Sequence, residues 1–150
     1  VLAERPEAQG VGIDASQKAL EIAQANACLL GDTGRVEFGH RNWRDHGWTE
    51  GLGTFDLILA NPPYVEEAAL LEADVREFEP SSALFAGPEG LDDYRILIPQ
   101  LRALMTDGAA AVLEIGAAQG AAVSELAEKS DFAIELRRDL AGRARALILS

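Results

Sequence analysis

The tetrapeptide Asn61-Pro62-Pro63-Tyr64 directly follows an apolar run and combines side chains that could present an amino group to an electrophile. The nitrogen of an amide or an aryl amine is a poor nucleophile because its lone pair is delocalised, but it carries two N–H donors. The Asn61 side-chain oxygen and the Pro62 carbonyl could accept those hydrogens and aim the lone pair at an incoming methyl group. Proline fixes φ and so preorganises both acceptors, while the Tyr64 ring offers a planar amide or base a surface for stacking. The structural alternative is a Pro-Pro turn that ends a strand.

Two further groups could bind a nucleotide-like ligand. Asp14 ends the apolar segment 11–14, and a carboxylate at the end of the second strand of a nucleotide-binding sheet can accept hydrogen bonds from both ribose hydroxyls. The structural alternative for Asp14 is a favourable interaction with the positive, N-terminal end of a helix dipole. Asn42 and Trp43 follow segment 35–41, where an aromatic ring could pack on adenine and the amide could bond to the edge of the base. The alternative for Trp43 is a loop side chain that covers the core.

The elements that must position these residues alternate along the chain. Ser16 is a plausible N-cap and Gly31 a plausible C-cap for one helix, and Asp107-Gly108 is expected to form a turn. The run at 55–60 is continuously apolar, as in a strand that is buried on both faces. Strands are expected at 10–15, 35–41, 55–60, 109–116, 132–140 and 143–150, and helical residues at 1–5, 17–30, 91–105 and 118–130.

The expected buried faces follow from helical spacing. The first full helix has an apolar stripe of Ala19, Ala23, Ala27 and Leu30, and the later one has Tyr94, Leu97, Ile98, Leu101, Leu104 and Met105. The alternation of strands and helices indicates an α/β fold with a mostly parallel sheet, to which the final hairpin adds an antiparallel strand. Ligands of such sheets bind outside the carboxyl ends of the strands, which is where the three candidate groups fall.

Composition limits the partners. The chain has 150 residues with 13 basic and 25 acidic side chains, a net charge of -12, so stable nucleic-acid binding is not expected. Cys28 is the single cysteine, which excludes an internal disulfide and fits a cytoplasmic location. No apolar run has the length of a membrane span, and neither a membrane partner nor a metal is expected.

The motif at Asn61–Tyr64 resembles that of amino-group methyltransferases that use S-adenosylmethionine, both adenine-N6 and protein-glutamine N5 enzymes. Segments 75–98 and 113–120 are more similar to the release factor glutamine methyltransferase family. The most discriminating positions of that similarity are Glu79, Pro80, Ala83, Leu84 and Gly90. The resemblance extends from residue 11 to residue 149.

The resemblance implies a class I S-adenosylmethionine-dependent methyltransferase sheet, which is Rossmann-like. It assigns cofactor binding to Asp14, Asn42, Trp43 and Asn61, substrate binding to Asn61, Pro62, Pro63 and Tyr64, and catalysis to Asn61, Pro62 and Tyr64. The implied substrate is the glutamine of the Gly-Gly-Gln motif of class 1 peptide chain release factors. The intact protein is expected to be a monomer.

Two departures from the family pattern stand out. Many relatives have Asp where this chain has Asn42, which can both donate and accept hydrogen bonds. The family's first strand, its glycine-rich loop and its N-terminal helical domain have no counterpart before residue 11. Residues 1–150 are therefore expected to be the C-terminal portion of a methyltransferase, a partial catalytic domain that binds the cofactor poorly on its own.

Three alternatives remain open from the sequence. An adenine-N6 methyltransferase shares the motif but would need a basic face or a target-recognition insertion. A non-catalytic fragment of the fold is a second alternative. A permuted methyltransferase could use residues 113–120 as its cofactor loop, because they follow a strand and open a helix; otherwise Glu114 is expected beside the acceptor pocket.

Overall fold

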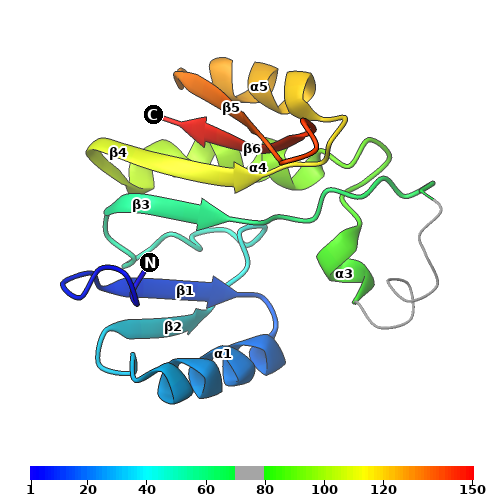
Figure 1. The fold of residues 1–150 in the computed structure, drawn as a ribbon. Coiled ribbons are helices and arrows are strands. Elements are labelled where there is room, and N and C mark those ends of the chain that lie inside the picture. Colours follow the sequence, from blue (N-terminus) through cyan, green and yellow to red (C-terminus); the bar gives the residue numbers. More distant parts are fainter. Residues whose placement is uncertain (70–79) are drawn as a thin grey trace. The chain divides into compact units, whose positions relative to one another are not determined.

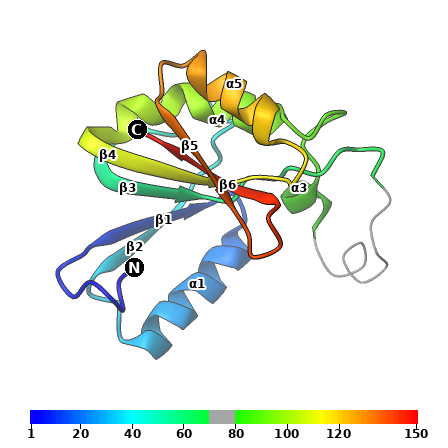
Figure 2. The same ribbon diagram turned by 45° about the horizontal axis from the view of Figure 1, so that its top comes forward.

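The computed structural model describes residues 1–69 and 80–150, which form two compact units, residues 1–48 and 49–150 (Figure 1). In unit 1, strands β1 (Gly10–Asp14) and β2 (Val36–His40) pair in parallel. Helix α1 (Gln17–Leu30) connects them and packs against both strands (Figure 2). Because the two strands are parallel and Asp14 pairs with His40, the residues that follow each strand emerge at the same edge of this pair.

Local capping explains the limits of α1. The Ser16 hydroxyl oxygen accepts a hydrogen bond from the Ala19 N–H at 3.3 Å, and Gly31 adopts the left-handed conformation with φ of 76°. Both expected caps are confirmed. The expected buried stripe is only partly right: Ala27 is buried, but Leu30 is 74% exposed, because it is the last helical residue and the chain turns away directly after it.

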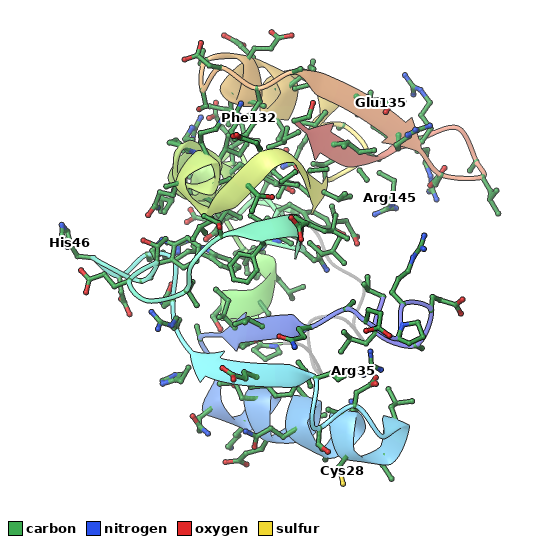
Figure 3. The ribbon with its side chains drawn as sticks, turned by 90° about the vertical axis from the view of Figure 1, so that its left-hand side faces the viewer. Cys28, Arg35, His46, Phe132, Glu135 and Arg145 are labelled. Atoms are coloured by element: carbon green, nitrogen blue, oxygen red, sulfur yellow. The ribbon has the colours of Figure 1, made fainter. Side chains whose placement is uncertain are left out.

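The segment before β1 forms hydrogen-bonded turns rather than the expected end of a helix. One of these turns has the helical spacing, with the Arg5 N–H donating to the Val1 carbonyl at 3.0 Å. The Arg35 guanidinium, labelled in Figure 3, donates to four carbonyls of the segment and forms an ion pair with the buried Asp32. Arg35 thereby attaches residues 1–9 to the start of β2.

Unit 2 is built on a four-stranded sheet of order β3-β4-β6-β5. The parallel pair is β3 (Phe55–Ala60) and β4 (Met105–Glu114); β6 (Ala144–Leu149) is antiparallel to both β4 and β5 (Ile134–Arg138). The helices are α3 (Ser81–Leu84), α4 (Asp92–Leu101) and α5 (Gly120–Glu128), with a 3-10 turn at Arg102–Leu104. Helix α5 packs against β5, β6 and α4. Fully buried side chains of this core include Tyr94, Ile98, Leu101, Leu113, Ile115, Val123, Leu147 and Leu149.

Three expectations for unit 2 need correction. Leu57 and Leu59 are 43% and 59% exposed, so the expected burial of β3 on both faces was wrong; β3 is also the edge strand of this sheet. Met105 starts β4 instead of ending the preceding helix. Asp107 and Gly108 lie inside β4, where the register with β3 shifts and Gly108 has φ of 79°. The turn expected there is a bulge within the strand.

The C-terminal hairpin is confirmed as an antiparallel pair, β5 with β6. Its connection is closed by the Asp139 N–H, which donates to the Arg143 carbonyl at 2.8 Å, and by Gly142, which has φ of 77°. Cys28 is a free and exposed thiol (Figure 3). Among the helices of residues 1–69 and 80–150, none is both long and apolar enough to cross a membrane.

Candidate active site

The segment Asn61–Tyr64 leaves the carboxyl end of β3 with its first side chain exposed and its second one buried. The Asn61 carboxamide has no hydrogen bond to any residue of the described ranges, whereas Pro62 is among the fully buried side chains. Pro63 and Tyr64 are half-buried. A buried proline beside an exposed amide produces a rigid segment whose amide is open to a ligand.

Tyr64 is held at both its backbone and its ring. Its carbonyl accepts a hydrogen bond from Gln119 Nε2 at 2.9 Å, and its hydroxyl donates a long one to Glu114 Oε1 at 3.4 Å. Glu114 ends β4, which is the parallel neighbour of β3, so both residues lie at the carboxyl edge of the sheet. Arg145 Nη1, from β6, also donates to Glu114 Oε1, at 3.4 Å. Glu114 therefore lies beside Tyr64, one of the predicted acceptor-site residues.

Tyr94 fixes the end of β4 from within the core. Its hydroxyl donates to the main-chain carbonyl of Glu114 at 2.7 Å, and its side chain is fully buried. Burial raises the pKa of the Tyr94 phenol, and the nearby Tyr64, Glu114 and Asp93 raise it further. The phenol therefore keeps its proton throughout the physiological range and remains a hydrogen-bond donor.

Gln119 joins three loops, and its sequence context alone did not predict a role for it. It is buried, its Oε1 accepts from the Gly116 N–H at 3.1 Å, and its Nε2 lies within hydrogen-bond distance of the carbonyls of Tyr64, Glu89 and Gly90. The Gly116 N–H already donates to the Gln119 side chain, so it is not free to bind a ligand. Residues 113–120 therefore have an internal structural role, which weighs against their use as a permuted cofactor loop. The sequence signal that could have identified Gln119 was a polar residue next to a glycine, between an expected strand and an expected helix.

The segment that distinguishes the resembled family pairs with Val65, directly after Asn61–Tyr64. Val65 forms a parallel bridge with Phe85: its N–H donates to the Leu84 carbonyl at 2.8 Å, and its carbonyl accepts from the Ala86 N–H at 3.0 Å. Leu84 is buried. Glu79 and most of the acidic run at 65–79 lie outside the residues that the structure describes.

Gly90 occupies a position that only glycine can take. Its φ is +67°, and an added Cβ would lie 2.3 Å from the Tyr64 carbonyl oxygen and 2.7 Å from Gln119 Nε2. We expect Gly90→Ala to lower the free energy of unfolding by about 2–4 kcal/mol, since left-handed strain and overpacking both contribute. The matched control is Gly51→Ala, because Gly51 has φ of +74° with nothing within 4 Å of an added Cβ. Urea unfolding of both variants measures the difference, and equal losses would contradict the close packing on Tyr64.

In unit 1 the candidate ligand groups gather at the carboxyl edge of β1 and β2. The exposed Asp14 uses Oδ1 to accept the Ser16 N–H at 2.7 Å, while no residue in the described ranges forms a hydrogen bond or ion pair with its Oδ2. Asn42 Oδ1 accepts from the Arg44 N–H at 2.9 Å, which leaves its NH₂ group as a donor. Trp43 is half-buried. Asp14 thus supports the start of α1 and still presents one carboxylate oxygen.

The predicted residues therefore fall into two sets, each assembled within one unit. Asp14, Asn42 and Trp43 belong to unit 1, and Asn61–Tyr64 belong to unit 2 together with Glu114 and Gln119. Over the described parts of the chain, no group of three or more His, Cys, Asp or Glu side chains is arranged to hold a metal ion.

Comparisons with known proteins identify relatives of this chain. No protein-family model matches the chain. It is 40% identical to the release factor glutamine methyltransferase of Rhodospirillum rubrum over 151 aligned residues, which cover 99% of this chain and 45% of that protein. It is 44% identical to the enzyme of the same name from Caulobacter vibrioides, over 84% of this chain and 43% of that protein. The chain thus spans about half the length of the curated relatives that it matches.

A solved structure supports the fold separately. An O-methyltransferase family protein from Burkholderia thailandensis superposes with a TM-score of 0.70 at 18% identity, over 100% of this chain and 46% of that one. At such low identity the likeness concerns the fold alone. The chain therefore has the fold of class I S-adenosylmethionine-dependent methyltransferases, and its sequence is related over nearly its whole length to the release factor glutamine methyltransferase family.

Proposed function

We propose that residues 1–150 form the C-terminal part of the catalytic domain of an S-adenosylmethionine-dependent protein-glutamine N5-methyltransferase, and that this part contains the acceptor site. Its substrate is the glutamine of the Gly-Gly-Gln motif of class 1 peptide chain release factors. The observation that carries the proposal is an exposed Asn61 amide without a hydrogen-bond partner among residues 1–69 and 80–150, held on a buried proline and followed by an anchored tyrosine, in a chain 40% identical to a release factor glutamine methyltransferase.

The proposed acceptor site needs no strong base. The Asn61 oxygen and the Pro62 carbonyl accept the two N–H groups of the substrate amide, and the Tyr64 ring stacks on the amide plane. Neither acceptor has a hydrogen-bond donor among residues 1–69 and 80–150, so both retain unused acceptor capacity. These two hydrogen bonds favour a pyramidal substrate nitrogen and direct its lone pair at the incoming methyl group. The nitrogen becomes acidic as it gains the methyl group, and its proton leaves to a nearby acceptor.

The residues at the carboxyl edge of unit 1 fit the nucleoside part of the cofactor. The open oxygen of Asp14 can accept from a ribose hydroxyl, the Asn42 NH₂ can donate to the edge of adenine, and the Trp43 ring can pack on the base. S-adenosylmethionine supplies an electrophilic methyl group carried on a positively charged sulfur. Asn61 is proposed to lie next to that group and to contact both cofactor and substrate.

Methyl transfer from labelled S-adenosylmethionine to three substrates tests this function in the intact protein that carries these residues. The substrates are a class 1 release factor, the same factor with the Gln of Gly-Gly-Gln changed to Ala, and adenine-containing DNA. We expect label on the first alone. Label on the DNA would favour the adenine-N6 alternative, and equal label on both factors would exclude the glutamine as acceptor.

A further inference from the structure

We propose that Gln119 is a positioning residue for the acceptor site, acting through the main-chain carbonyl of Tyr64. This inference rests on the proposed function and deepens it, because it assigns the rigidity of the segment Asn61–Tyr64 to a side chain 55 residues away from Tyr64 in the sequence. Gln119 does not touch the reacting atoms. Its effect on the reaction passes through the backbone that carries Asn61 and the Tyr64 ring.

The hydrogen bonds of the Gln119 amide show what it holds. Three carbonyl oxygens converge on Nε2, those of Tyr64 at 2.9 Å, Gly90 at 3.1 Å and Glu89 at 3.3 Å. The bond to Tyr64 is the shortest of these and is also shorter than the 3.4 Å contact of the Tyr64 hydroxyl with Glu114. The backbone anchor is therefore the stronger of the two constraints on Tyr64.

The two prolines transmit this constraint to Asn61. Pro62 and Pro63 separate Asn61 from Tyr64, and both have a fixed φ. Pro62 is also fully buried, so the segment has little freedom to absorb a displacement of Tyr64. A shift of the Tyr64 carbonyl therefore moves the Asn61 and Pro62 acceptors as well, and displacements of about 1 Å in such contacts can cost on the order of 10²-fold in rate.

The surroundings of Gln119 are shaped to hold one orientation of its amide. An added Cβ on Gly116 would lie 2.7 Å from Oε1, and one on Gly90 would lie 2.7 Å from Nε2. Oε1 faces the Gly116 N–H and Nε2 faces carbonyls only, so a flipped amide would place acceptor against acceptor. The site thus requires a donor and an acceptor at fixed positions.

Gln119→Glu keeps an acceptor oxygen, but the ability of the side chain to donate a hydrogen bond then depends on pH. A glutamate carboxylate cannot donate to the three carbonyls, whereas the protonated acid can donate one hydrogen bond to them and still accept from Gly116. Facing carbonyl oxygens inside the protein, the carboxyl group has its pKa raised above the usual Glu value of about 4.3. We expect kcat for the release factor to fall about 10- to 100-fold at pH 8, and part of that loss to be recovered at pH 6.

Three comparisons make the test specific, all in the intact protein with circular dichroism at each pH. Gln24→Glu, on the exposed surface of α1, carries the same charge change and should follow the wild-type pH profile. Gln119→Met should lose activity without the pH-dependent recovery. S-adenosylmethionine affinity should change far less than kcat in both Gln119 variants, because three of the four residues assigned to the cofactor, Asp14, Asn42 and Trp43, belong to the other unit.

The outcomes separate the inference from the function on which it rests. Wild-type protein that fails to methylate the release factor would overturn both. An active wild type with a Gln119→Glu profile parallel to that of Gln24→Glu would overturn the positioning role alone. If Gln119→Glu is unfolded at pH 8, Gln119→Met decides: a lower kcat with cofactor affinity retained supports the role, and an unchanged kcat contradicts it.

Discussion

Asn61→Ala in the intact protein is expected to reduce methyl transfer to the release factor by about 10²-fold or more, the size of the loss when one preorganised transition-state contact is removed. The exposed carboxamide has no partner within the described ranges, so its removal should leave the fold unchanged. Single-turnover kinetics with saturating cofactor measures the effect on the chemical step. Asn26→Ala, an exposed position on α1, is the matched control and should retain full activity. Equal rates for both variants would exclude Asn61 from the acceptor site.

Asn61→Asp separates two roles of the same side chain. Aspartate keeps an acceptor oxygen and the shape of the residue, but it loses the NH₂ donor and adds a negative charge. If holding the substrate N–H groups is the whole role, the Asp variant should retain much more activity than the Ala variant. If the Asn61 NH₂ group also bonds to the cofactor, the Asp variant should fall with the Ala variant, and its cofactor affinity should fall as well.

Asp14→Ala is expected to weaken S-adenosylmethionine binding by about 1–3 kcal/mol, the scale of a lost charge-assisted hydrogen bond. Isothermal titration calorimetry measures this directly. Asp14 also accepts the Ser16 N–H, so the variant loses part of the support for the start of α1.

Ser16→Ala is the control for that second effect. It removes the hydrogen bond from the Ala19 N–H and weakens the cap of α1, while the Asp14 carboxylate stays in place. We expect its cofactor affinity to match that of the wild type. An equal loss of affinity in both variants would assign the effect to the helix cap, and an unchanged affinity in a folded Asp14→Ala protein would remove Asp14 from the cofactor site.

The features that local sequence determines were predictable. Ser16 and Gly31 set the ends of α1 through bonds to residues within four positions, so the helix could be bounded without knowledge of the rest of the fold. The Asn61–Tyr64 motif was recognisable for the same reason, because its four residues are consecutive in the sequence. The family resemblance that this motif suggested is confirmed by relatives at 40–44% identity over most of the chain.

The features that depend on distant partners were not predictable. Met105 and Gly108 fit a helix end and a turn by themselves, yet pairing with β3 draws both into β4 as a bulged strand. Leu57 and Leu59 have the pattern of a strand buried on both faces, although β3 is an edge strand of its sheet. Gln119 shows no helical or strand periodicity, and its importance emerges only when three loops meet around its amide.

Tandem mass spectrometry of the release factor after reaction tests the central claim most directly. The intact wild-type protein and S-adenosylmethionine are expected to add one methyl group to the side-chain nitrogen of the glutamine in Gly-Gly-Gln, and fragment ions locate that mass on one residue. The Asn61→Ala protein should leave the same peptide unmodified over the same time. A methyl group on another residue of the factor, or an unmodified factor after reaction with active wild-type protein, would contradict the proposed glutamine N5 chemistry.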